Sequence, residues 1–184
     1  SSSYNGTISG TYGGKSAAGS IVIEDGSLAR STFGGKDALS KLKTIRADLT
    51  VGGEKVPWNI VSTSYLDPAT FVPLGFSDSS SYQVVESATL PVTGRVGDAG
   101  PLYTIARYTQ DGLTRTGSQL VNFSVEADTA STAIFKVTDV TKDTSGKEVS
   151  RSTVSFRIST AGTVTRVQET LQEPGTDLTI RLAF

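Results

Sequence analysis

The 184-residue chain contains no cysteine, no histidine and no methionine. Without cysteine there is no disulfide, no thiolate nucleophile and no cysteine-held iron–sulfur cluster. Without histidine there is no imidazole base and no histidine ligand for a metal. Because these absences remove common catalytic and metal-binding side chains, we expect neither a metal site nor a cofactor.

Neither sign of charge is in excess. The 17 basic residues are scattered among 18 acidic ones, and the net charge is −1. A nucleic-acid-binding protein clusters Lys and Arg to neutralise phosphates, so we expect no nucleic-acid partner. No apolar run approaches the roughly 18 residues of a transmembrane helix, and we expect no membrane span.

The C-terminal residues alternate between apolar and polar up to the end of the chain, with Leu178, Ile180, Leu182 and Phe184 on one face. This pattern resembles the closing strand of bacterial outer-membrane barrels. Such barrels carry two girdles of aromatic side chains, whereas aromatic residues make up only 8 % of this chain. A strand with one buried face gives the same alternation, and we favour this interpretation.

The start of the chain suggests where the protein resides. It begins Ser1-Ser2-Ser3 without methionine, and Ser, Thr and Gly are abundant while Lys is scarce. We expect an exported protein whose signal has been removed, although a trimmed cytosolic domain remains an alternative. The serine-rich start resembles the polar tether of bacterial lipoproteins. In a bacterium, the protein would then be periplasmic or tethered to the outer membrane.

The composition favours strands over helices. The chain has 19 glycines and many Ser and Thr residues. Threonine suits a pleated surface and glycine supplies turn conformations, whereas long helices need more Ala, Leu, Glu and Lys. We predict an all-β fold, an antiparallel sandwich or barrel.

The C-terminal half predicts six strands, each with alternating apolar residues. Tight turns separate them, such as Asp111-Gly112, Asp143 to Gly146 and Pro174-Gly175. Short turns require antiparallel neighbours, so we expect a six-stranded up-and-down meander. The expected strands are 102–110, 113–126, 132–141, 148–158, 163–171 and 177–184.

The N-terminal half is less regular. We expect one or two helical turns over Lys36 to Leu42, a turn at Asp25-Gly26 and no regular element over 64–81. The expected strands are 4–12, 20–24, 28–33, 44–51, 54–61, 82–85 and 89–96. The glycine-rich segment from Gly94 to Pro101 is a candidate linker.

The domain boundary follows from this linker. We predict an N-terminal β unit over 1–94 and a C-terminal meander over 95–184, or one continuous domain. Similar short segments recur in the two halves 86 and 80 residues apart, which indicates either a duplicated β unit or chance. The two halves are therefore candidates for related units.

Two short motifs fall short of catalytic patterns. Gly10 to Ser16 resembles a phosphate-binding loop, but its spacing is one residue short. Asp143 to Gly146 resembles an aspartic protease motif, but it carries an extra residue and has no second copy. We therefore expect no catalytic residues and no enzymatic activity.

The segment 57–82 is a candidate ligand- or partner-binding loop. It combines three prolines with five aromatic residues. Long irregular segments in compact domains are commonly functional or disordered, and aromatic residues argue against disorder. The alternative is that the rings cap the β core. The candidate binding residues are Trp58, Tyr65, Phe71, Phe76 and Tyr82.

Two functions fit these observations. The first is a non-catalytic exported module, such as a bacterial lipoprotein, that binds or scaffolds an envelope protein. The second is a small lipocalin-like barrel that binds an apolar small molecule. A ligand barrel needs a cavity of several hundred Å³ with apolar walls, whereas a scaffold needs a filled core with an exposed patch or edge strand.

Overall fold

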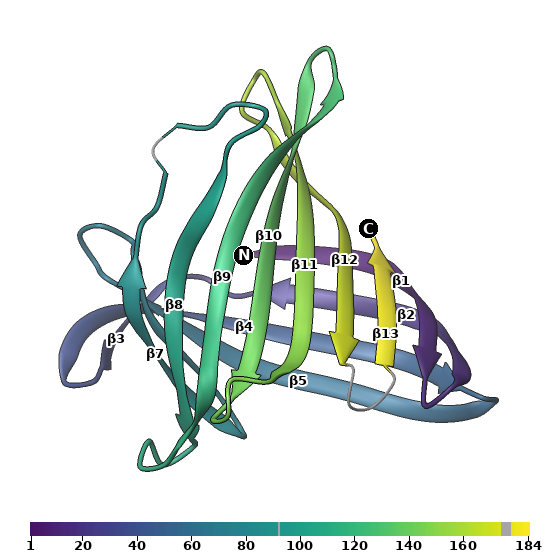
Figure 1. Cartoon of the computed structure of the whole chain (residues 1–184), viewed down its shortest axis with the longest axis horizontal. Helices are drawn as coiled ribbons and strands as arrows, with labels where there is room; N and C mark the ends of the chain where they lie inside the picture. Colours follow the sequence, from purple (N-terminus) through teal and green to yellow (C-terminus); the bar gives the residue numbers. More distant parts are fainter. Residues whose placement is uncertain (92, 174–177) are drawn as a thin grey trace.

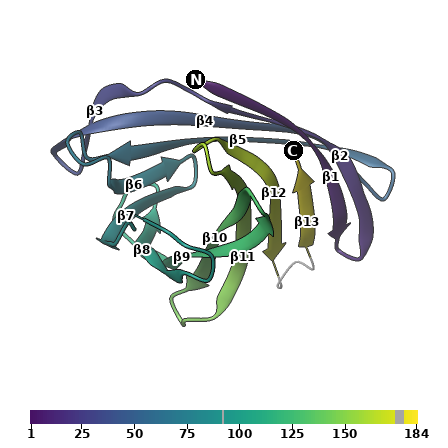
Figure 2. The ribbon, with the colours of Figure 1, turned by 90° about the horizontal axis from the view of Figure 1, so that it is seen from above.

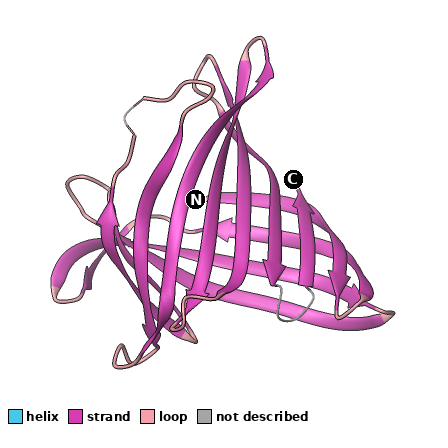
Figure 3. Ribbon diagram, viewed as in Figure 1, coloured by secondary structure: helices cyan, strands magenta, loops and turns pink. Residues whose placement is uncertain are grey.

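The computed structural model describes residues 1–91, 93–173 and 178–184. Strands account for 76 % of the chain, and the described residues form no helix (Figure 3). The predicted all-β fold is therefore confirmed.

Thirteen strands make up the described structure. The strands of the N-terminal half are β1 (Ser2–Tyr12), β2 (Lys15–Asp25), β3 (Ala29–Phe33), β4 (Lys36–Val51), β5 (Glu54–Leu66), β6 (Pro73–Asp78) and β7 (Ser81–Ala88). Those of the C-terminal half are β8 (Ala99–Thr109), β9 (Arg115–Thr129), β10 (Thr132–Asp143), β11 (Glu148–Ser159), β12 (Val164–Glu173) and β13 (Leu178–Ala183).

The strands form one closed antiparallel barrel of twelve strands. Neighbouring strands pair in chain order from β4 to β13, β13 pairs with β1, and β1 pairs with β2. Pairing of β2 with β4 closes the ring, and β3 lies outside it along the first part of β4. Figure 2 shows this ring, with the long strands β4 and β5 running across one side.

The two sides of the barrel run in different directions. In Figure 1, strands β8 to β12 run upright at the front, and β1, β2, β4 and β5 cross behind them. A strongly twisted sheet that closes on itself brings its two sides together at a large angle. The side chains that point inward from these two walls form the core.

Two glycines allow close strand approach near the closure. A Cβ atom on Gly19 of β2 would lie 2.0 Å from the backbone oxygen of Asp48 on β4. A Cβ atom on Gly6 of β1 would lie 2.5 Å from the backbone oxygen of Ala183 on β13. Any larger residue at either position would push these paired strands apart.

The interior holds two hydrophobic clusters. The larger lies where β1, β2, β4 and β13 meet, and Ile21 and Ile23 are its most deeply buried members. The smaller lies on β8 and β9 and consists of Leu102, Ile105 and Val121. Each cluster covers part of the interior, and polar side chains occupy much of the rest.

The predicted C-terminal meander is confirmed. Strands β8 to β13 are sequential neighbours in the sheet, with turns at Gly112 and Gly146 that have the positive φ angles of 74° and 84°. The expected turn at Pro174-Gly175 lies outside the described residues. Two-residue periodicity with short turns was a sufficient signal here, because strands such as β9 and β13 carry apolar residues at alternate positions and the turns between strands are short.

The predicted helical turns over Lys36 to Leu42 are wrong, because this segment begins β4. Gly34 and Gly35 turn the chain with φ angles of 56° and 77°, so that residues 36–40 pair with β3. Residues 39–51 pair with β5 on the other side. A seven-residue segment is too short to form a stable helix by itself, and pairing on both edges prevails.

Three further N-terminal expectations are corrected. Asp25-Gly26 makes no hairpin, because β2 and β3 both pair with β4 and Gly26 donates its N–H to the Leu42 carbonyl across a short break. The described part of 89–96 is a loop, and Pro91 in it lacks the N–H that a strand ladder needs. The segment 64–81, where no regular element is expected, contains the end of β5, all of β6 and the first residue of β7. These stretches of strand are too short to show the alternation of apolar and polar residues.

The predicted boundary at residue 94 falls in the loop between β7 and β8. Strands from both sides of this loop pair in the same sheet.

Candidate functional site

The five candidate aromatic residues lie in separate places. Tyr65 and Tyr82 stack on the two sides of Phe33, with ring centroids 4.7 Å and 4.9 Å from it. The Phe33 ring is buried against Gly75, where a Cβ atom would lie only 2.1 Å from it. Tyr65 and Tyr82 therefore belong to a three-ring stack that fastens β3 to the barrel.

The other three candidates do not join this stack. Phe76 packs against the smaller hydrophobic cluster and against the Tyr103 ring, 6.3 Å away. Trp58 packs against the larger cluster. Phe71 lies in the loop after β5, is 54 % exposed and has a φ of 58°. These three rings and Tyr65 do not form a single cluster, because β5, β6 and the loop between them carry the rings to different places.

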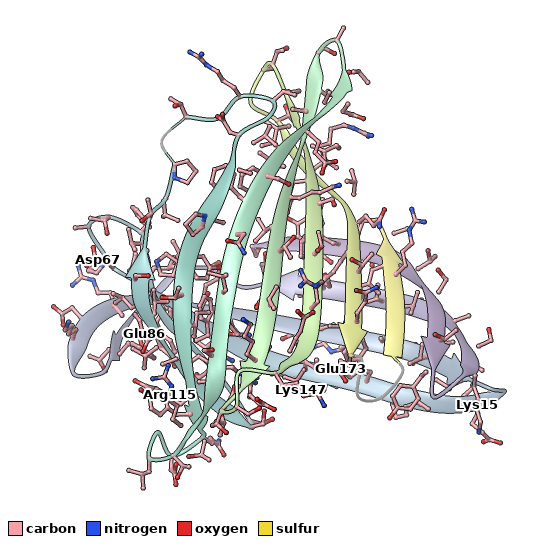
Figure 4. The ribbon with its side chains drawn as sticks, viewed as in Figure 1. Lys15, Asp67, Glu86, Arg115, Lys147 and Glu173 are labelled. Atoms are coloured by element: carbon pink, nitrogen blue, oxygen red, sulfur yellow. The ribbon has the colours of Figure 1, made fainter. Side chains whose placement is uncertain are left out.

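The loop that carries Phe71 is held by Asp67. The Asp67 carboxylate accepts hydrogen bonds from the backbone N–H groups of Ala69 and Thr70 and from the Thr70 hydroxyl. These bonds, those from Thr70 first, lower the pKa of Asp67. In Figure 4, Asp67 lies at the far left, away from Lys15 at the lower right. The loop therefore presents Phe71 far from the end of the barrel near Lys15.

An apolar pocket lies at that end, and we call it the Trp58 pocket. It has a volume of about 690 Å³. The pocket forms where the β1–β2 turn and the tip of the β4–β5 hairpin face β12 and β13. Its apolar walls are Leu49, Val51, Val56, Trp58, Leu171 and Ile180.

The walls of the Trp58 pocket continue the larger hydrophobic cluster. Leu49, Val51 and Ile180 are buried members of that cluster, and Leu171 and Trp58 pack against it. Val56 is nevertheless 42 % exposed, as Tyr12 at the rim is 48 % exposed. The pocket is therefore a hollow in which the core reaches solvent.

An open strand edge borders this pocket. Over residues 54–61, β5 pairs with β4 on one side, and no other described strand pairs with it there. Pro57 lies on this stretch and lacks a backbone N–H, which discourages the addition of another strand. Lys15, Glu54 and Glu173 supply the charged groups of the rim.

A second apolar pocket, of about 550 Å³, lies at another part of the barrel beside the loop between β7 and β8. Its walls include Leu102, Phe123, Phe135 and Ile158, and no charged side chain lines its described part. The Phe123 and Phe135 rings stack with their centroids 5.8 Å apart. This pocket is smaller and carries no tryptophan.

A cluster of polar side chains lies inside the wall formed by β8, β9 and β10. Gln119 donates hydrogen bonds from its Nε2 atom to Asp139 Oδ2, at 3.3 Å, and to Thr141 Oγ1, at 3.1 Å. Burial raises the pKa of Asp139 to about 6, although Arg107 opposes this. Burial, and then the Asp139 charge, raises the pKa of Tyr103 to about 12. Arg107 Nε, Gln119 Oε1 and Asp139 Oδ1 are buried and have no partner among the described residues.

A second cluster of charged side chains comes from β2, β4 and β12. Lys41 on β4 forms an ion pair with Asp25 on β2 at 3.2 Å. Arg166 on β12, only 8 % exposed, forms an ion pair with Glu169 and lies 4.8 Å from the Phe184 ring centroid. Sequence analysis overlooked both polar groups, because charged residues at alternate strand positions give no sign of which face is inside.

No family model, no curated protein and no solved structure matches the chain. Among the described residues there is no group of three or more His, Asp or Glu side chains placed to hold a metal ion. No helix in this part of the chain is long and apolar enough to span a membrane. The candidate site therefore rests on the geometry of the barrel itself.

The buried Asp139 predicts a specific pH dependence of stability. The pKa of Asp139 is about 6 in the folded state, against an ordinary value of 3.8. Between pH 3.8 and pH 6, the folded state therefore keeps a proton on Asp139 that the unfolded state has lost. Its contribution to stability therefore decreases as the pH rises through this window. We expect Asp139→Asn to stabilise the protein above the window by about 3 kcal/mol relative to its effect below it.

Urea unfolding on either side of the window measures this difference. Asp67→Asn is the control, because the lowered pKa of Asp67 makes its contribution change in the opposite direction. An equal effect of Asp139→Asn at both pH values would show that the Asp139 pKa is not raised.

The two phenylalanines of the candidate loop predict different responses to truncation. Phe76→Ala removes a ring from the core and should cost about 3 kcal/mol of unfolding free energy. Phe71→Ala removes an exposed ring and should cost less than about 0.5 kcal/mol. The role of the five aromatic residues in binding stays a prediction, so both variants are also tested for capture of envelope proteins. Equal destabilisation by the two changes would contradict the placement of Phe71.

Proposed function

We propose that this protein is a non-catalytic barrel that binds an apolar small molecule in the Trp58 pocket. One observation carries the proposal: a pocket of about 690 Å³ whose apolar walls extend the hydrophobic core to the protein surface. Ligand pockets have typical volumes of about 300–1,000 Å³ and mostly apolar walls with a few polar groups. Of the five aromatic candidates, Trp58 is the one that lines this pocket.

The two apolar pockets favour a ligand-binding barrel over an envelope scaffold. A scaffold needs a filled core and a projecting surface, whereas here two apolar hollows interrupt the packing. An apolar molecule in the Trp58 pocket would remove the exposed part of Val56 from water. Burial of apolar surface contributes roughly 25 cal/mol per Å², so the pocket supplies a driving force for binding.

The proposal includes no reaction. The sequence has no His or Cys, and the charged groups at the rim, Lys15, Glu54 and Glu173, surround an apolar hollow. Such a rim orients a ligand that carries a polar end. Binding without chemical conversion is the simplest use of this arrangement.

The extracytoplasmic location is a further part of the proposal. It is supported by the composition, which is rich in Ser, Thr and Gly and low in Lys. A periplasmic carrier of an apolar molecule would combine both expectations. Cell fractionation with an antibody against the protein tests this, and recovery in the cytosolic fraction alone would contradict it.

Val56 offers a direct test of the pocket. It is 42 % exposed and lines the pocket from β5, so Val56→Glu should leave the fold intact. The carboxylate would place a charge against an apolar ligand and should weaken the binding of 1-dodecanol at least about tenfold, which corresponds to 1.4 kcal/mol. Trp58 is the only tryptophan, so its fluorescence reports binding at this site.

Val61→Glu is the matched control. Val61 lies on the same strand, is 46 % exposed and points to the opposite face because the two positions differ by an odd number. The Val61→Glu protein should bind dodecanol with the same affinity as the unmodified protein. Absence of any saturable fluorescence change with dodecanol would refute the proposed function, as would equal weakening by both substitutions.

A further inference from the structure

Charged side chains of β2, β4 and β12 lie around one further lysine of β4, Lys43. Lys41 is paired with Asp25, and Arg166 is paired with Glu169. Lys43 lies two residues beyond Lys41 on β4 and therefore points to the same inward face. Among the described residues, no side chain forms an ion pair or a hydrogen bond with the Lys43 ammonium group.

The Lys43 side chain is partly buried and lies on the same face of β4 as the buried Ala47 and Leu49. Burial lowers the pKa of Lys43, and the Arg166 charge lowers it further. Asp25 and Glu169 oppose this effect, and Lys41 adds to it. Three cations thus face two carboxylates. A partly buried charge without a partner is costly, so a negatively charged group beside Lys43 would stabilise it.

Two further groups on this wall have unused hydrogen-bonding capacity. Arg166 is more than nine-tenths buried, and its Nε atom has no partner among the described residues. Ser62 on β5 is directly opposite Lys43, so their side chains share the inward face. The Ser62 hydroxyl makes no hydrogen bond to another described residue, although Ser64 beside it donates to the Lys41 carbonyl.

A continuous apolar face connects Lys43 with the Trp58 pocket. Opposite pairs on β4 and β5 run from Leu49 and Val56, through Ala47 and Trp58, to Ile45 and Ile60. The next pair is Lys43 with Ser62. Trp58, Ile45 and Ile60 are only partly buried. Ala47 and Lys43 are four positions apart, which corresponds to about 13 Å at the rise of a β-strand.

We propose that Lys43 binds the anionic head group of an amphiphile whose apolar chain lies in the Trp58 pocket. The chemical class is a long-chain carboxylate: its negative charge pairs with the Lys43 ammonium group, and Ser62 can donate a hydrogen bond to the second oxygen. This inference rests on the proposed function and specifies the ligand of that site. The charge-assisted bond fixes the orientation of a ligand that the apolar walls alone would not orient.

The test compares a carboxylate with an uncharged ligand of the same chain length. Calorimetric and fluorescence titrations at neutral pH measure the binding of dodecanoate and 1-dodecanol to the full chain. We expect Lys43→Met to weaken dodecanoate at least about tenfold and to change dodecanol less than about twofold. Lys43→Arg should retain dodecanoate binding, because it preserves the charge.

Lys55→Met is the matched control for loss of a charge. Lys55 is an exposed residue of β5, an odd number of positions from Val56 and therefore on the outer face. The Lys55→Met substitution should leave the affinities for dodecanoate and 1-dodecanol unchanged. Thermal melting accompanies each titration, and Lys43→Met should melt at the same temperature or higher, because it removes an unpaired charge.

The pH provides a second measurement. Dodecanoate affinity should decrease as the pH rises through the lowered pKa of Lys43, because the amine then loses its charge, whereas dodecanol affinity should not. The other charged groups facing Lys43 are Asp25 on β2, Lys41 on β4, and Arg166 and Glu169 on β12. Asp78 on β6 lies beyond Ser62 and is bound by Ser80 and Ser81.

The outcomes separate the two proposals. If neither ligand binds, the proposed function fails and the inference fails with it. If dodecanol and dodecanoate bind equally well and Lys43→Met affects neither, the barrel binds apolar molecules but Lys43 is not the head-group site. Equal weakening of both ligands by Lys43→Met would indicate a structural role and also overturn the inference.

Discussion

The pairing of β2 with β4 is the constraint on which the rest of the structure depends. It joins strands on either side of β3 and converts an open meander into a ring. At this seam Gly19 lets the two backbones approach, because a Cβ atom there would meet the Asp48 carbonyl. Without closure, β2 and β4 would present two long unpaired edges to other chains.

Closure also creates the chemistry of the interior. Twelve strands enclose more space than the short apolar side chains of this sequence fill, so hydrophobic clusters occupy only part of it. Charged side chains that point inward must find partners, and Lys41 with Asp25 and Arg166 with Glu169 do so across strands. The proposed binding rests on the apolar Trp58 pocket and on Lys43, which has no ion-pair partner among the described residues.

The accuracy of the sequence-based predictions depended on how one-sided each strand is. The C-terminal strands have one apolar and one polar face, so their positions followed from alternation and turns. The prediction of helical turns over residues 36–42 is wrong because it rests on the helical spacing of Leu39 and Leu42. In the structure this segment pairs with β3 on one side and with β5 on the other. The short β6 is covered by core on one face and by Phe33 on the other, which removes the alternation on which a prediction depends.

The sequence by itself determined the all-β class, the order and turns of the C-terminal strands, and the absence of cysteine and histidine chemistry. These properties follow from composition and local periodicity, which act over a few residues. The tertiary structure alone decided the closure of the sheet, the separation of the five aromatic residues and the position of Lys43. Pairs such as Gly19 with Leu49 and Arg166 with the Phe184 ring depend on register between distant strands. Because a one-residue slip exchanges the inner and outer faces of a strand, only the assembled barrel determines which charges lie inside.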